Sequence, residues 1–174
     1  MVGKMNKNKT VKYKIIKHSE NVYLSECRRE DNLRNIANSI LTSISIVLAV
    51  FMELVYKLLE NLPDYKPMIV SISFILCLIL LISLFCAILT NWPYKKSEPN
   101  SGRNLLDFVN NNLKTYVDGD GFLDQRITDL DDMSLSLFRI NNIKAKFLVC
   151  SCSLLICFIV LTIIFSFVIL YAVK

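Results

Sequence analysis

Residues 68–92 read MIVSISFILCLILLISLFCAILTNW, a run without a single charged side chain. Two further uncharged runs lie at residues 35–52 and 147–173. Each meets the length of about 18 to 20 apolar residues that a helix needs to cross a bilayer. We therefore expect an all-α membrane protein with three transmembrane helices, at residues 36–59, 68–89 and 147–173.

The composition agrees with a membrane protein. Of the 174 residues 53% are hydrophobic, the mean hydropathy is +0.44, and about 45–50% apolar residues is usual in a soluble domain. The three expected spans leave only short segments outside the bilayer, none of which can bury a large core. This argues against a water-soluble enzyme and against a large catalytic domain.

The distribution of positive charge predicts the direction of threading. Most of the 20 Lys and Arg lie in residues 1–34 and 92–146, and cytoplasmic segments carry an excess of these residues. We expect an N-in, C-out protein of the inner (plasma) membrane, with the turn at residues 60–67 outside. The predicted parts are a basic cytoplasmic arm and helix (1–34), a transmembrane hairpin (35–92), a cytoplasmic hairpin of two helices (93–146) and a third transmembrane helix (147–173).

The cytoplasmic segments show two patterns. Residues 1–17 carry six lysines and no acid, which fits a flexible arm on anionic lipid headgroups or an arm that neutralises a phosphate ligand; the alternation around Tyr13 is at most a weak strand pattern. Between spans two and three, helical spacing at residues 105–117 and 123–140 predicts an antiparallel helical hairpin, turned at Asp118-Gly119-Asp120-Gly121. The apolar face of its second helix comprises Leu123, Ile127, Leu130, Met133, Leu137 and Ile140.

The sequence offers no residues for catalysis or for a metal. Five of the six cysteines lie inside expected spans, no C-x-x-C pair occurs, and there is one His, so neither a disulfide framework nor a zinc site is expected. A calcium loop starting at Asp118 lacks the required residues at Phe122, Leu123 and Asp129. We expect no enzyme, no catalytic residue and no cofactor. Because no aromatic stacking platform is interleaved with the positive charge, we also expect no nucleic-acid binding.

The first span carries a polar stripe. On a helix the residues Asn35, Asn38, Thr42, Ser45, Ala49, Glu53 and Tyr56 share one sector. Because polar side chains in a span face other helices or water, two interpretations stay open. The stripe is a packing seam, with Glu53 paired to Lys57 near the outer interface, or it lines a conduit in an oligomer. Its candidate pore or seam residues are Asn38, Thr42, Ser45 and Glu53.

The other two spans carry weaker polar patterns. Ser83, Cys86, Ala87 and Thr90 cluster near the inner end of the second span, and Cys150, Ser153 and Cys157 share one side of the third. Small polar residues let helices approach closely. Both groups are expected to form helix–helix contacts.

The order of parts resembles a known family. The hairpin ends in Phe85-Cys86-Ala87-Ile88-Leu89-Thr90-Asn91-Trp92-Pro93, the cytoplasmic segment contains Asp129-Leu130-Asp131-Asp132-Met133, and Lys144-x-Lys146 precedes the last span. Over roughly residues 30–172 this resembles the transmembrane effectors of Pycsar anti-phage systems, and more loosely the two-span SLATT-type effectors.

The resemblance implies a function that composition does not show. A partner cyclase makes a cyclic pyrimidine nucleotide, the effector binds it and assembles as a homo-oligomer, and disruption of the inner membrane causes abortive infection. Coulomb attraction to such an anion favours Arg103, Lys114, Arg126 and Arg139 as binding candidates, since the lysines beside the spans, such as Lys144 and Lys146, are explained as headgroup anchors. Two alternatives remain: a non-catalytic membrane scaffold or partner-binding subunit, and a small ion channel or transporter unrelated to defence.

Overall fold

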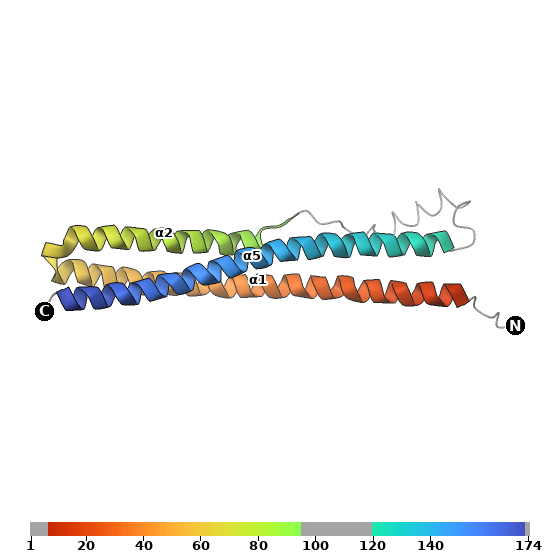
Figure 1. Ribbon diagram of the computed structural model, residues 1–174, viewed down its shortest axis with the longest axis horizontal. Helices are drawn as coiled ribbons and strands as arrows, with labels where there is room; N and C mark the ends of the chain where they lie inside the picture. The colour runs from red at the N-terminus through yellow and green to blue at the C-terminus, as the bar shows by residue number, and fades with distance from the viewer. Residues whose placement is uncertain (1–6, 95–119, 173–174) are drawn as a thin grey trace. The chain divides into compact units, whose positions relative to one another are not determined.

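The computed structural model describes residues 7–94 and 120–172, and this part of the chain is helical (Figure 1). The elements are α1 (Lys7–Asn61), the short 3-10 helix η1 (Pro63–Tyr65), α2 (Lys66–Asn91) and α5 (Asp120–Ala172). Three helices, α1, α2 and α5, are long and apolar enough to cross a membrane. The prediction of an all-helical chain with three such helices is confirmed.

α1 is longer than the sequence pattern suggested. It runs without a break for 55 residues, about 80 Å at a rise of about 1.5 Å per residue, whereas a bilayer's hydrocarbon core is about 30 Å thick. The segment around Tyr13, in which a flexible arm or weak strand was expected, is therefore helical. The helix predicted at residues 105–117 lies outside the described residues, and so does the hairpin it would form.

The chain divides into two compact units. The first, called here the helical pair, is formed by residues 7–31 of α1 and residues 120–142 of α5. The second, called here the membrane unit, contains residues 32–93 and 143–172. Each is described separately.

In the helical pair, α1 and α5 run parallel. Lys12 Nζ lies 2.8 Å from Asp124 Oδ2, Ser19 Oγ donates to Asp131 Oδ1 over 3.2 Å, and both pairs are 112 residues apart in sequence. A constant separation means that the two helices advance together in the same direction. All residues of the predicted apolar face of α5 are buried except Ile127, which is half-buried, so that face is confirmed.

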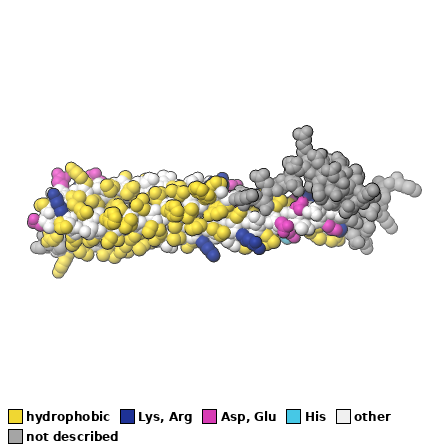
Figure 2. Space-filling model, turned by 90° about the horizontal axis from the view of Figure 1, so that it is seen from above, with side chains coloured by type: hydrophobic (Ala, Val, Ile, Leu, Met, Phe, Trp, Pro, Cys, Tyr) yellow, Lys and Arg dark blue, Asp and Glu magenta, His cyan; other side chains and the backbone are white. Residues whose placement is uncertain are grey.

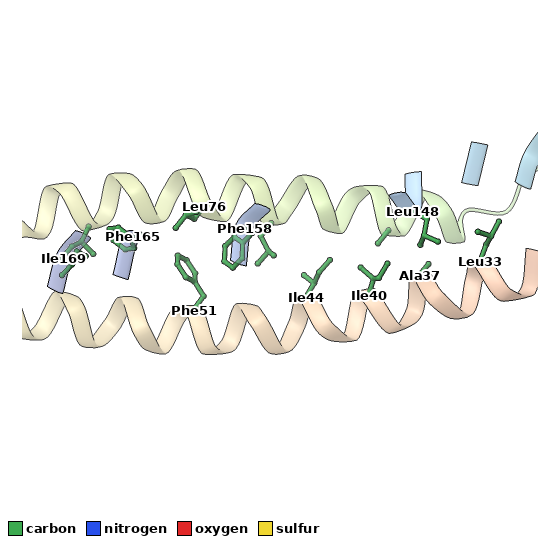
Figure 3. Close-up of a cluster of buried hydrophobic side chains, with 13 residues drawn as sticks. Leu33, Ala37, Ile40, Ile44, Phe51, Leu76, Leu148, Phe158, Phe165 and Ile169 are labelled. Carbon is green, nitrogen blue, oxygen red and sulfur yellow. The ribbon is translucent and has the colours of Figure 1, made fainter. Parts of the chain in front are cut away.

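In the membrane unit, α1, α2 and α5 pack around one apolar core (Figure 3). The buried positions lie alternately four and three residues apart, as in knobs-into-holes packing. On α1 they are Leu33, Ala37, Ile40, Ile44 and Phe51; on α2 Ile69, Ser73, Leu76, Leu80, Ser83, Ala87 and Thr90; on α5 Lys144, Leu148, Ser151, Phe158, Phe165 and Ile169. Half-buried Val47, Leu155 and Thr162 fill the remaining steps.

Two local features set the hairpin and its core. Pro67 lies in the first turn of α2, as predicted, where its missing N–H costs no helical hydrogen bond. The rings of Phe51 and Phe158 meet edge to face, with centroids 5.1 Å apart, a favourable geometry for aromatic pairs. Figure 3 shows both rings in the space between the helices.

The closest polar contact of the core joins α2 to α5. Ser83 Oγ donates to the Ser151 carbonyl over 2.9 Å, and Ser151 Oγ donates to the Ser83 carbonyl over 2.8 Å. Both residues are completely buried. Reciprocal bonds between a side chain and the opposite backbone require the two helices to approach closely, which only small residues allow.

We predict that Ser83→Ala and Ser151→Ala destabilise the folded protein and do so non-additively. Hydrogen bonds between membrane helices average about 0.6 kcal/mol and reach about 1.7 kcal/mol, so a double-mutant cycle should give a coupling free energy in this range. The measurement is the free energy of unfolding in bicelles. Ser71→Ala is the matched control, because Ser71 is exposed and bonds to the Pro67 carbonyl of its own helix. A Ser83→Ala loss no larger than that of Ser71→Ala would contradict the contact.

Candidate functional site

The polar stripe predicted on the first span lies on the outer surface of the membrane unit. All seven of its residues are exposed: Asn35, Asn38, Thr42, Ser45, Ala49, Glu53 and Tyr56. The core-facing residues of α1, among them Ile40, Ile44 and Phe51, lie on the other side of the helix. We call this outward set the α1 stripe. Apart from Asn38, it does not serve packing between the described helices of a single chain.

The other helices of the membrane unit present apolar surfaces. Exposed large hydrophobic residues on α2 include Phe74, Ile75, Leu81, Ile82 and Phe85, and those on α5 include Val149, Ile156, Val160, Ile163 and Phe167. Figure 2 shows hydrophobic side chains next to one another over much of one face. An apolar groove of about 300 Å³ between α1 and α5, lined by residues such as Val50 and Ile163, adds to this surface. Such surfaces suit lipid chains. Exposed serines such as Ser71 and Ser153 also occur on α2 and α5, but the α1 stripe is a row of polar residues along one helix.

The hydroxyl groups of α1 use their protons within the helix. Thr42 Oγ1 donates to the Asn38 carbonyl over 3.1 Å and Ser45 Oγ to the Leu41 carbonyl over 3.0 Å. Ser39 and Ser43 bond in the same way to the carbonyls four residues before them. This back-bonding lowers the cost of placing a hydroxyl among apolar groups. The oxygen atoms keep the capacity to accept a further bond from a neighbouring helix or from water.

Asn38 is the member of the α1 stripe that also contacts another helix. Asn91 Nδ2, near the end of α2, donates to Asn38 Oδ1 over 2.8 Å. No described residue accepts a hydrogen bond from the side-chain amide of Asn38, and the buried Asn91 Oδ1 has no partner among the described residues. The Asn38–Asn91 pair therefore ties α1 to α2 and leaves polar atoms unused.

Glu53 forms the ion pair that its spacing predicted. Its Oε1 lies 3.1 Å from Lys57 Nζ, and about two thirds of each side chain is exposed. An exposed pair at this spacing contributes little stability, about 0.3–0.5 kcal/mol.

The contact group expected on α2 is buried, and the expectation is confirmed for Ser83, Cys86, Ala87 and Thr90. The expected group on α5 is confirmed only in part: Cys150 Sγ lies 3.8 Å from Cys86 Sγ of α2, whereas Ser153 and Cys157 are exposed and make no cross-helix hydrogen bond to a described residue.

The cationic candidates for nucleotide binding are not brought together. Arg103 and Lys114 lie outside the described residues. Arg126 NH2 lies 3.8 Å from Glu20 Oε1 in the helical pair, whereas Arg139 is exposed. Thirteen residues separate the two arginines on α5, which is about 20 Å along a helix, so they do not converge on one ligand.

Lys144 and Lys146 differ in their surroundings. Lys146 is exposed, as a headgroup anchor should be. Lys144 is only 1% exposed, and its carbonyl accepts a bond from Thr90 Oγ1 at 3.5 Å. The expectation that Lys144 anchors to headgroups is wrong, because its position in the four-and-three pattern of α5 turns the side chain inward.

A polar network in the helical pair was not singled out from the sequence. Asn141, completely buried, donates through Nδ2 to the carbonyl and to Oε2 of Glu26, each over 2.9 Å. Arg29 pairs with the same carboxylate at 3.4 Å, donates to Asn142 over 2.9 Å and lies over the ring of Phe138. The sequence did contain a signal for this network. Asn141 lies on the apolar face of α5, and an asparagine at such a position can fix the pairing register of coiled coils.

A groove of about 450 Å³ opens beside this network. Its lining residues are Val22, Glu26, Asp131, Ser134, Leu135 and Phe138. The floor is largely apolar and the charged members are carboxylates. Such a groove does not suit the phosphate of a nucleotide, because like charges repel.

Comparison with known proteins assigns no relative. No protein-family model, no curated protein and no solved structure matches the chain. Within residues 7–94 and 120–172 there is also no group of three or more His, Cys, Asp or Glu side chains placed to hold a metal ion.

Proposed function

We propose that the protein is a membrane effector of a bacterial anti-phage signalling system of the Pycsar type. A cyclic pyrimidine nucleotide made by a partner cyclase activates it, copies assemble, and the loss of inner-membrane integrity causes abortive infection. The structural observation that carries the membrane and assembly part is the exposed α1 stripe. The signal and the defence setting follow from the family that the sequence resembles.

The α1 stripe supports assembly because of where it lies. Polar side chains in a membrane helix favour neighbouring helices or water over lipid. Apart from the Asn38 contact, the described helices of one chain do not cover the stripe, so other copies of α1 are the simplest neighbours. Several α1 helices facing one another would then place Asn38, Thr42, Ser45 and Glu53 along a shared polar path.

The proposed orientation is N-in and C-out, with the helical pair in the cytoplasm where the nucleotide is made. Positive charge in residues 1–34 and 92–146 supports this direction. Of the cationic candidates, Arg139 is exposed and ready to contact an anion, while Arg126 would first have to leave Glu20. Arg103 and Lys114 complete the proposed set.

One observation favours the membrane scaffold as a second candidate. Thr42 and Ser45 already donate to their own helix, so they do not need water, and a dry seam against a partner would also satisfy them. A transporter that uses Glu53 has less support, because Glu53 is paired with Lys57 near the end of α1 and transporter sites lie near the bilayer midplane.

One prediction of the proposed function concerns the topology of the chain in the membrane. Fusions of alkaline phosphatase and of green fluorescent protein after Lys174 should give phosphatase activity and no fluorescence, because the proposed C-terminus is outside the cytoplasm. Fusions at Asn61 and at Pro93 provide an outside and an inside reference. Fluorescence after Lys174 would contradict the N-in, C-out arrangement.

Another prediction of the proposed function concerns the α1 stripe. Replacing both Thr42 and Ser45 with Leu should abolish nucleotide-dependent depolarisation, measured with a potential-sensitive dye in cells, while the protein still inserts, since added apolar surface favours insertion. Ser71→Leu is the matched control, because Ser71 is an exposed membrane serine on α2 with the same bond to its own helix. It should depolarise normally.

Two results would refute this proposal. If the Thr42→Leu, Ser45→Leu protein depolarises cells as fast as the unchanged protein, the stripe does not line the path. If no cyclic pyrimidine nucleotide causes depolarisation of cells that hold the unchanged protein, the effector function is wrong and the scaffold is favoured.

A further inference from the structure

The helical pair carries an apolar groove on one flank. Three of the groove's lining side chains remain well exposed, Leu135 by 55%, Phe138 by 46% and Val22 by 39%. Adjacent exposed apolar side chains on a water-facing surface often mark an interaction site. The described part of the chain supplies no side chain that fills the groove.

The opposite flank carries a protruding leucine. Leu24 is 51% exposed and follows Val22 by two residues, which is about 200° around an α-helix. Val22 lines the groove, so Leu24 points away from it. The helical pair therefore has an apolar knob on one flank and an apolar groove on the other.

The knob and the groove lie at the same level along the pair. The Lys12–Asp124, Ser19–Asp131 and Arg29–Asn142 contacts join residues 112 or 113 apart. Leu24 is therefore level with Ser136 and Leu137, within the stretch of α5 that lines the groove. Copies in one membrane share one orientation, and rotation about an axis parallel to the helices keeps every residue at its level. Leu24 of one copy can thus reach the groove of the next without any shift along the axis.

The charges on the two flanks are complementary at matched levels. Lys17 lies two helical turns before Leu24 on the same flank, is exposed, and pairs with no described residue. Its level corresponds to residue 129 of α5, within about 3 Å along the axis of Asp131 at the edge of the groove. A second copy would therefore place the Lys17 ammonium close to this carboxylate.

We propose that the helical pair binds a second copy of this chain side by side, with Leu24 of one copy in the groove of its neighbour and Lys17 beside the neighbour's Asp131. The contact uses two different surfaces and is heterologous, so its repetition forms a ring where the rotation between copies closes. It extends the proposed function, on which it rests for the oligomeric state, by naming the surfaces that meet outside the bilayer.

Cysteine cross-linking in native membranes tests this arrangement. The native cysteines are first replaced by serine or alanine, and two tagged forms are co-expressed, one with Leu24→Cys and the other with Leu135→Cys. A short bis-maleimide should give a dimer carrying both tags, while either form alone should give none. Tyr13→Cys paired with Leu135→Cys is the matched control, because Tyr13 is as exposed as Leu24 but lies eleven residues away along α1.

Charge variants give a second readout of the same contact. Lys17→Glu should lower the cross-linked fraction by up to about five-fold, the range of an exposed ion pair, and Asp131→Lys in the same chain should restore it. This rescue distinguishes a direct contact from partial unfolding of the helical pair.

Three outcomes would overturn the proposal: no Leu24–Leu135 product, a product no stronger than the Tyr13 control, or dimers from Leu135→Cys alone, which would mean that grooves meet face to face. The readout does not need a nucleotide. Cross-linking without nucleotide-dependent depolarisation would therefore refute the proposed function and support this interface. Depolarisation without cross-linking would support the proposed function and refute this interface.

Discussion

The alternation of four- and three-residue steps between buried side chains is the constraint on which the structure depends. It is present on α1, α2 and α5, and a repeat averaging 3.5 residues keeps one narrow face of each helix toward its neighbours. Large residues such as Phe51 and Phe158 fill parts of the core. At Ser83 and Ser151 small residues let backbones come close enough for reciprocal hydrogen bonds.

This constraint also decides what lies outside. Ile40, Ile44 and Phe51 occupy the inner face of α1. Thr42 and Ser45 lie on the other side of the helix and therefore face outward. A soluble protein would leave hydroxyls there without consequence. In a helix able to cross a membrane they form a polar line on a largely apolar exterior, and this line is the observation that supports the proposed assembly.

Charge-free runs and apolar periodicity were enough to predict three helices long and apolar enough to cross a membrane, and the buried face of α5 from Leu123 to Ile140. The position of Pro67 in the first turn of α2 was also predicted. The same reasoning missed the helical state of the residues around Tyr13, since that segment is stabilised by distant partners such as Asp124. It also missed the inward position of Lys144 and the Asn141–Glu26 network, because polar residues at core positions break the pattern that sequence reasoning follows. The direction of the α1 stripe needed the three-dimensional packing, since a polar stripe alone is compatible with either face.

The most direct test of the account is the lipid exposure of α1 in the assembled protein. Spin labels at Ile44, Ser45 and Val50, in bilayers at high protein-to-lipid ratio, would report collision rates with dissolved oxygen, which concentrates among lipid chains. The account predicts frequent collisions at Val50, few at Ile44 because the core of one chain shields it, and few at Ser45 because neighbouring copies cover the α1 stripe, with collisions at Ser45 alone rising on dilution with lipid. Collisions at Ser45 as frequent as those at Val50 in the concentrated bilayer would show that the stripe faces lipid and would contradict the account.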